Sequence, residues 1–299
     1  MNKGILAGIG AYTLWGLFPI YWRWLENDPA SEILAHRMVW SLVFVAGILT
    51  IQREWGWLRA AMHNRRTMLI YTLAAVLLSL NWYTYIWAVN AGFVVEASLG
   101  YFINPLVNFL LGVIFFREKL RRGQIVAVVL AGLGVVYLTV SYGSLPWISL
   151  ALAITFGAYG LIKKTAALES MHGFSLETIV LFLPALAYLI YRDATGVGAF
   201  VHQGLLVTTL LILAGPVTSI PLLLFGYAAR RIPLSMLGFI QYITPTMQFL
   251  LGVFVYLEPF PQARLVGFSI IWLALLLYSL EGVYFNRKLK ATPSVVELL

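Results

Sequence analysis

Two apolar segments of the chain carry uncharged polar side chains at matching positions. Residues 97–116 and 234–256 each hold three such groups: Tyr101, Asn104 and Asn108 in the first segment, and Gln241, Thr244 and Gln248 in the second. Spacings of three, four and seven residues place each set on one face of a helix. Amide, hydroxyl and phenol groups hydrogen-bond either to neighbouring helices or to a polar solute. Because six paired groups exceed what packing needs, we favour a solute-facing role.

A proline follows the central polar residue on each of these faces. Pro105 comes directly after Asn104, and Pro245 comes directly after Thr244. A proline inside a helix leaves one backbone carbonyl without its usual partner and bends the helix. We therefore expect both segments to bend toward a shared cavity.

Arg37 is a cation inside a third apolar segment, residues 33–51. A charge within a bilayer is costly, so it faces a cavity, pairs with an acid or reaches to the surface. Local pairing with Glu32 or Glu177 is the favoured explanation, and a role with solute or protons is the alternative. The neighbouring His36 is expected to be hydrogen-bonded or interfacial, although its titration range would suit a proton relay.

Aromatic residues form a further group of candidates. Most of the 10 Trp and 16 Tyr are expected in the two belts where membrane meets water. Four lie in the middle of apolar segments, where they could line a pocket together with Asn81: Tyr12, Trp15, Tyr85 and Tyr159.

Catalytic and metal-binding constellations are not found in the sequence. The chain has no cysteine, its 4 His are scattered, and its 12 acidic residues lie mostly in loops. A membrane enzyme would need a nucleophile, a metal cluster or paired carboxylates. We expect no catalytic residue, no metal and no cofactor.

The composition decides which elements position these residues. Of the 299 residues, 61% are hydrophobic and 11% charged, and the mean hydropathy is +0.86, all far from the values of soluble domains. Apolar runs near the twenty residues that cross a bilayer recur along the chain. The sequence predicts an all-α polytopic membrane protein with about ten spans: 4–22, 33–51, 68–89, 97–116, 124–140, 147–162, 176–191, 205–227, 234–256 and 265–284.

The basic residues predict an orientation. With the N-terminus inside, sixteen of the 20 Lys and Arg fall in cytoplasmic segments and three fall on the opposite side. An even number of spans with both termini in the cytoplasm satisfies this bias. The net charge of +8 does not indicate nucleic-acid binding, because the cations lie in short loops and form no basic face.

The sequence contains an internal repeat. A shift of 140 residues superposes Ile103, Pro105, Gly112 and Glu118, with four further residues, on identical residues from Ile243 to Glu258. Five spans per half is an odd number, so the halves must cross the membrane in opposite directions. We expect residues 1–140 to form the first repeat, residues 141–286 the inverted second repeat, and residues 287–299 a cytoplasmic tail.

Three motifs resemble a known family. They are the opening Tyr12-Thr13-Leu14-Trp15-Gly16, the stretch from Ala97 to Pro105 that runs on to Arg117-Glu118-Lys119-Leu120, and its echo ending at Glu258. These resemble the EamA-type branch of the drug/metabolite transporter superfamily. The stretch Glu32 to Arg37, with Trp40-Ser41, looks like its chloramphenicol-sensitive, RarD-like permeases.

The resemblance covers about Lys3 to Phe285 and implies a transporter in the bacterial inner membrane. It implies secondary transport, often export, of amino acids, metabolites or drugs by alternating access between two halves. A channel-like facilitator and a membrane-embedded enzyme are the alternatives. The four-span members of the superfamily carry a coupling glutamate in their first span, whereas this chain has none there. The coupling ion, the substrate and the oligomeric state are left open by the sequence.

Overall fold

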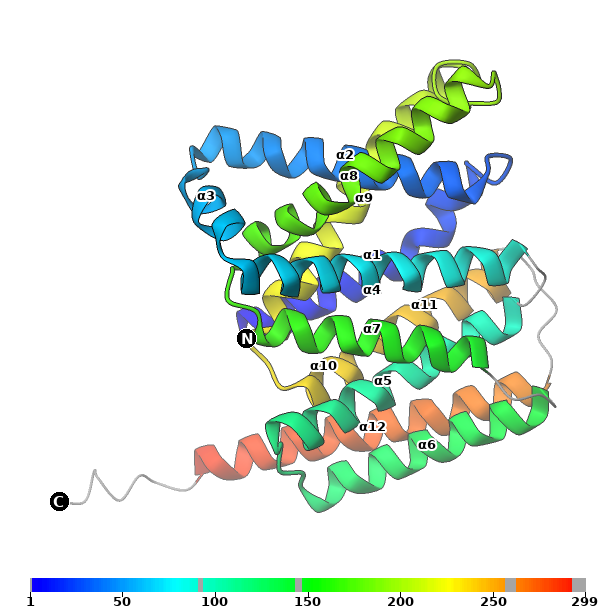
Figure 1. Cartoon of the computed structure of the whole chain (residues 1–299). Coiled ribbons are helices and arrows are strands. Elements are labelled where there is room, and N and C mark those ends of the chain that lie inside the picture. Colours follow the sequence, from blue (N-terminus) through cyan, green and yellow to red (C-terminus); the bar gives the residue numbers. More distant parts are fainter. Residues whose placement is uncertain (1, 91–93, 143–146, 256–261, 292–299) are drawn as a thin grey trace.

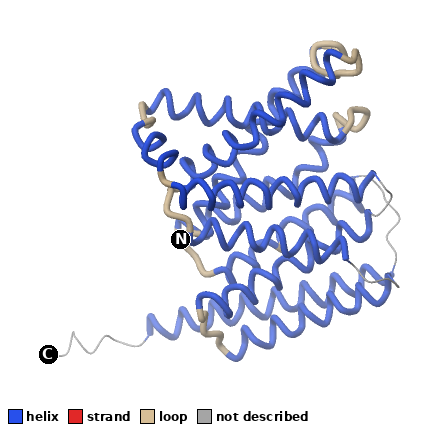
Figure 2. The backbone as a smooth tube through the Cα atoms, viewed as in Figure 1, coloured by secondary structure: helices blue, strands red, loops and turns tan. Residues whose placement is uncertain are grey.

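The computed structural model describes residues 2–90, 94–142, 147–255 and 262–291, and these residues form helices joined by short loops (Figures 1 and 2). Ten helical segments run between the two ends of the molecule: α1 (Lys3–Arg23), α2 (Ala30–Gln52), α4 (Arg65–Asn90), α5 (Val94–Phe116), α6 (Arg122–Tyr142), α7 (Trp147–Thr165), α8 (Ser170–Ala194), α9 (Leu205–Ala229), α10–α11 (Leu234–Gln241, Ile243–Leu250) with a π-helical extension (Leu251–Val255), and α12 (Gln262–Ala291). Each of the ten predicted spans coincides with one of these segments.

Eight of these segments are long and apolar enough to cross a membrane by length and composition alone. The two others are α7, which ends in Lys163 and Lys164, and the divided segment α10–α11. The fold is therefore the expected all-α membrane fold, with an inverted repeat of five helices in each half.

The structure departs from the predicted boundaries in three places. Helix α3 (Gly56–His63) was not predicted and lies in the loop between α2 and α4. Helix α8 begins at Ser170, six residues before the predicted start at 176. Helix α12 continues to Ala291, so the first residues of the predicted tail are helical, and residues 292–299 lie outside the described ranges.

The two prolines have different effects on their helices. Helix α5 runs through Pro105 without a break, so the bend expected there does not interrupt it. The equivalent helix of the second repeat is divided at Tyr242, three residues before Pro245. Because Pro245 has no N–H, the Gln241 carbonyl has no helical partner. The Tyr242 N–H instead donates to the Phe239 carbonyl at 3.2 Å, which tightens the turn.

The helix boundaries and the packing both follow the repeat. The starts of α2, α4, α5 and α6 are separated from those of α8, α9, α10 and α12 by 140 residues in each case. Helix α5 packs against α7, and in the equivalent contact α1 packs against α10 and α11. Likewise α1 packs against α9, and α7 packs against α4. The pairs α2–α8, α5–α10 and α6–α12 join equivalent helices of the two halves (Figure 1). This interlocked arrangement places the central helices of both repeats around one space.

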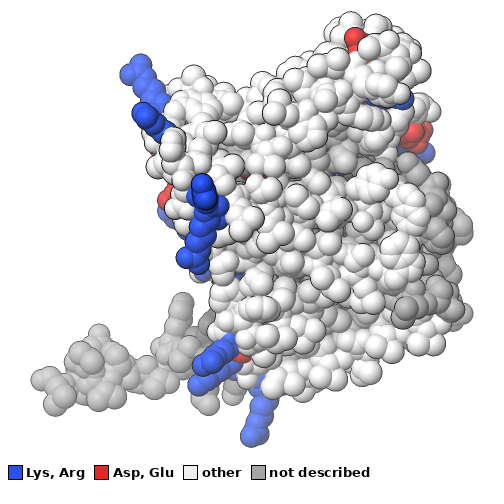
Figure 3. Space-filling model, viewed as in Figure 1, with Lys and Arg blue, Asp and Glu red and all other residues white. Residues whose placement is uncertain are grey.

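Most of the described charged side chains lie near the ends of the helices. In Figure 3 the visible Lys and Arg residues gather mainly at the end of the molecule where the N-terminus lies, while the flank is uncharged. Helix α12 also ends at this side (Figure 1). The end of the molecule that holds the N-terminus and the end of α12 is called the basic end below.

Candidate functional site

A central cavity of about 230 Å³ lies between helices of both repeats. It is lined by α1, α2, α4 and α5 of the first half and by α7 and α11, with the end of α10, of the second half. Its residues come from the halves of these helices farther from the basic end. Ten of the twelve predicted site residues line it: Tyr12, Trp15, Arg37, Asn81, Tyr85, Tyr101, Asn104, Gln241, Thr244 and Gln248.

Asn108 and Tyr159 do not reach this cavity. Both side chains are fully buried, at 0% exposure, on the side of the cavity toward the basic end. Asn108 lies one helical turn from Asn104 in the direction of the basic end. Its Nδ2 donates to Gln241 Oε1 at 2.8 Å and to Asn104 Oδ1 at 3.2 Å. Asn108 was predicted to face the solute. Its side chain instead lies in the contact between α5 and α10.

Several polar groups of the cavity wall also hold helices together. Thr244 Oγ1 donates to the Tyr12 carbonyl at 2.8 Å, and Gln248 Nε2 donates to the Trp15 carbonyl at 3.3 Å. Asn81 Nδ2 donates to the Leu152 carbonyl at 2.8 Å, which joins α4 to α7. In these contacts Thr244 uses its hydroxyl as donor, and Gln248 and Asn81 use their amide NH₂ groups. Packing thus accounts for part of the polar strip.

Asn104 differs from these residues. Its Oδ1 accepts the bond from Asn108, whereas its Nδ2 has no protein partner among the described residues. The amide NH₂ of a cavity-lining asparagine is then available to an acceptor on a solute.

Arg37 lies in the wall of the central cavity. Helix α2 starts at Ala30, which places Arg37 two turns inside it. Its Nε donates to Thr218 Oγ1 of α9 at 2.9 Å. Its guanidinium lies 4.1 Å from the centre of the Trp82 ring and 4.9 Å from that of the Trp22 ring, both cavity residues that the sequence reading did not select.

The predicted pairing of Arg37 with Glu32 or Glu177 is wrong. Glu32 accepts from Arg192 at 3.1 Å and from the Ala199 N–H at 2.5 Å. Glu177 pairs with Lys163 at 2.7 Å and accepts from the Tyr159 hydroxyl at 3.0 Å. Residues five apart do not share a helix face, so Glu32 points away from Arg37.

His36 lies outside the central cavity. Its Nδ1 accepts from Trp40 Nε1 at 3.3 Å and its ring packs 5.0 Å from that of Phe200. Its buried Nε2 has no partner within the described part of the chain, so the expected hydrogen bonding is found at one nitrogen only.

A packed aromatic layer closes the cavity toward the basic end. The Tyr159 and Phe225 rings stack at 6.0 Å, and Phe225 meets Tyr12 edge-on at 6.2 Å. All three side chains are at most 1% exposed. Beneath them the Lys163–Glu177 pair joins α7 to α8. This layer separates the cavity from the basic end.

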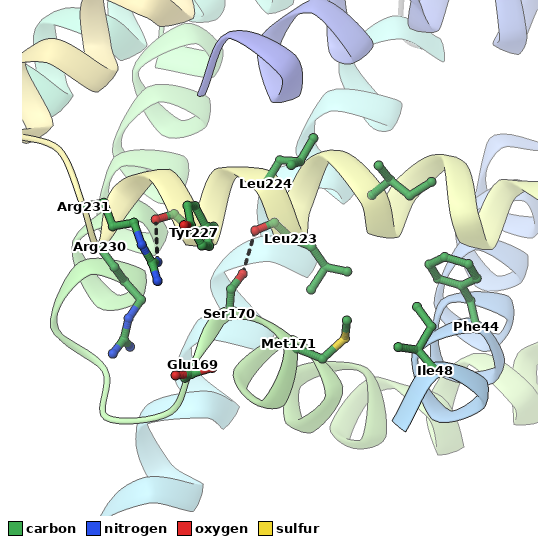
Figure 4. A pocket seen from close by; sticks show the side chains of 11 residues that line it. Phe44, Ile48, Glu169, Ser170, Met171, Leu223, Leu224, Tyr227, Arg230 and Arg231 are labelled. Atoms are coloured by element: carbon green, nitrogen blue, oxygen red, sulfur yellow. Dashed lines mark hydrogen bonds between the residues drawn. The ribbon is translucent and has the colours of Figure 1, made fainter. Parts of the chain in front are cut away.

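A second hollow, about 700 Å³, lies between α2, α8 and α9 near the basic end (Figure 4). Its walls are mainly apolar, with Phe44, Ile48, Met171 and Leu223 facing the space. Three of its polar side chains have protein partners: Ser170 Oγ donates to the Leu223 carbonyl at 2.7 Å, and Arg230 and Arg231 donate to backbone carbonyls. None of the predicted site residues lies in it, so the central cavity is the stronger candidate.

Comparison with known proteins gives a consistent picture. The profile of the EamA-like transporter family matches residues 2–140. The chain is 48% identical to Protein RarD of Streptomyces exfoliatus, over 97% of this chain and 92% of that protein. It is 46% identical to the uncharacterized transporter YojE of Bacillus subtilis (strain 168), over 97% and 98%, and 42% identical to Protein RarD of Escherichia coli (strain K12), over 96% and 97%.

The fold has also been seen in a crystal. One solved crystal structure superposes with a TM-score of 0.69 at 15% identity and covers 93% of this chain and 98% of its own. Such a likeness concerns the fold alone. The sequence relatives carry the assignment further: the chain belongs to the EamA-like transporter family, close to the RarD proteins.

Proposed function

We propose that the chain is a secondary transporter that moves small organic solutes, such as amino acids, metabolites or drugs, across the bacterial inner membrane, with export as the working direction. The central cavity carries this proposal. It is formed jointly by both repeats, lies within the membrane-spanning helices and contains ten of the twelve residues expected to meet a solute. An interface between inverted repeats is where such carriers bind their solutes.

The asymmetry of the cavity supports alternating access as the mode of transport. The layer of Tyr12, Tyr159 and Phe225 closes it toward the basic end, so this conformation is closed on that side. We assign the basic end to the cytoplasm, because Lys and Arg next to spans are retained there. Rocking of one repeat against the other would open this layer and close the cavity toward the opposite end of the molecule.

Counterflow in proteoliposomes tests the proposal. Purified protein is reconstituted into liposomes loaded with an unlabelled solute, and uptake of the same labelled solute is followed over a panel of amino acids and aromatic acids. A carrier gives transient accumulation of the label above equilibrium. A channel gives equilibration only, and an enzyme gives a chemically changed product.

A conformational readout complements the flux measurement. The chain has no cysteine, so a single cysteine replacing Ala228, which is buried in the same cluster as Tyr159 and Phe225, reports on the closed layer without background. We expect slow labelling in this conformation and faster labelling when a transported solute drives cycling. Equal labelling with and without every transported solute would contradict alternating access.

A further inference from the structure

The Arg37 guanidinium presents an unused hydrogen-bonding edge to the central cavity. Nε is committed to Thr218, and the two ring planes of Trp22 and Trp82 lie against the cation. Among the described residues, no hydrogen bond is made by Nη1 or Nη2. These two nitrogens form the fork that binds a carboxylate through two parallel bonds.

The charge of Arg37 also has no counter-ion in the described part of the chain. The described residues that line the cavity include no Asp or Glu. The two acids considered as its partners, Glu32 on its own helix α2 and Glu177 on α8, are bound to Arg192 and Lys163. Cation–π contacts with tryptophan offset part of the cost of desolvation, but a buried charge is stable chiefly when an opposite charge joins it.

The rest of the cavity is suited to a flat apolar body. Two pairs of aromatic rings line the cavity: Trp15 and Phe156 lie 5.7 Å apart, and Tyr85 and Tyr101 lie 5.8 Å apart. The volume of about 230 Å³ is smaller than that of pockets for drug-sized ligands, which hold about 300–1,000 Å³. The small volume of the cavity, its aromatic rings and the single cation Arg37 therefore suit a small monoanion with a planar apolar part.

We propose that the cavity selects small organic carboxylates, with the carboxylate bound by the Nη fork of Arg37 and the apolar part placed among the aromatic rings. This inference rests on the proposed transport function and names the substrate class for the same site. Amines of the same shape are disfavoured, because they would bring a second positive charge next to Arg37. Neutral amides lose the charge-assisted bonds.

A purely structural role for Arg37 is the competing explanation, since its bond to Thr218 joins α2 to α9. If Arg37 only held α2 and α9 together, replacing it would lower the stability of the protein and would affect the binding of every ligand in the same way. A carboxylate site changes the ranking of ligands. The decisive quantity is therefore the ratio of affinities between a carboxylate and its amide.

The test uses purified full-length protein and three probes of one shape: 3-phenylpropanoate, 3-phenylpropanamide and 3-phenylpropylamine. Affinities are measured by calorimetry or by the shift in thermal unfolding. We expect the carboxylate to bind about ten- to a hundredfold more tightly than the amide, as for hydrogen bonds to a charged group, and the amine to bind most weakly. The carboxylate affinity should fall as pH drops through the probe's own pKa, about 4.3 for an alkyl carboxyl.

Variants then locate the effect. Arg37→Gln should reduce the carboxylate-to-amide ratio to about twofold or less, while Arg231→Gln, at an exposed arginine near the basic end, should leave the ratio unchanged. A ratio that stays high in folded Arg37→Gln overturns the proposal. If that variant does not fold, equal binding of the carboxylate and the amide to the wild-type protein overturns it as well. Counterflow of neutral or cationic solutes with no such preference would contradict the substrate class and leave the transport function intact.

Discussion

Glu118 of the first repeat binds Ser235 of the second, where α10 begins. Glu118 Oε2 accepts from the Ser235 N–H at 3.1 Å and from its hydroxyl at 2.6 Å, while Oε1 accepts from the Leu234 N–H at 2.8 Å. The first N–H groups of a helix lack intrahelical partners, and a carboxylate also suits the positive end of the helix dipole. One side chain therefore caps the helix that carries Gln241 and joins the repeats at the basic end. Its repeat counterpart, Glu258, lies outside the described residues.

Replacing Glu118 with Gln should weaken this cap. Glutamine has one acceptor oxygen, and its NH₂ would face the N–H of Ser235. We expect a loss of about 1 kcal/mol, within the range measured for helix caps, and a lower unfolding temperature in detergent. Lys119→Gln, at an exposed neighbouring position, is the control and should unfold like the wild type. Equal unfolding temperatures for both variants would show that the contact contributes nothing.

The buried pair of Lys163 and Glu177 gives a second stability prediction. Its side chains are 3% and 1% exposed, so Glu177→Gln leaves a buried cation with no counter-charge. Breaking such a pair typically costs about 3–5 kcal/mol. The double variant Lys163→Met with Glu177→Gln removes both charges and should recover much of that loss. Unfolding of the two single variants and the double variant in detergent measures the coupling, and strictly additive losses would argue against it.

Much of the fold could be predicted from the sequence because lipid restricts the possibilities so strongly. Apolar runs of about twenty residues must be helices, since no water is available to bond an exposed backbone. Each of the ten predicted spans corresponds to a helical segment of the structure. The repeat was visible because Pro105 and Pro245 keep the same register, and the helix starts obey the same shift. Helix α3 escaped notice because its eight residues are too few for a periodic signal.

The environment of each polar residue was harder to predict. Periodicity assigned Asn104 and Asn108 to one helix face, but it gives no measure of how deep a neighbouring helix penetrates. Helix α10 approaches α5 at Gly238, where an added Cβ would lie 2.6 Å from the Pro105 carbonyl oxygen. That close approach covers Asn108 and leaves Asn104 at the cavity. For Arg37, sequence proximity to Glu32 suggested a pair, whereas the tertiary fold gave Glu32 a different cation, Arg192.

The orientation of the chain can be tested with single cysteines. Arg59 on α3 is exposed near the basic end, and Leu205 at the start of α9 is 84% exposed at the opposite end. Because the chain has no cysteine of its own, each replacement reports alone. An impermeant maleimide added to intact cells should label Leu205→Cys and not Arg59→Cys. The reverse pattern would mean that the basic end faces outward.

Asn104 and Asn108 provide a matched pair of variants on one helix, and they separate solute binding from packing. Asn104 lines the cavity with a free Nδ2, so Asn104→Ala should weaken the affinity for a transported solute by about 1 kcal/mol, roughly fivefold, with little change in unfolding temperature. Asn108 is fully buried and bonds Gln241 across the repeats, so Asn108→Ala should lower stability by about 1–3 kcal/mol. Its effect on affinity should be smaller than that of Asn104→Ala. Measuring both quantities on each purified variant decides the roles, and lowered stability with unchanged affinity in both would remove Asn104 from the solute site.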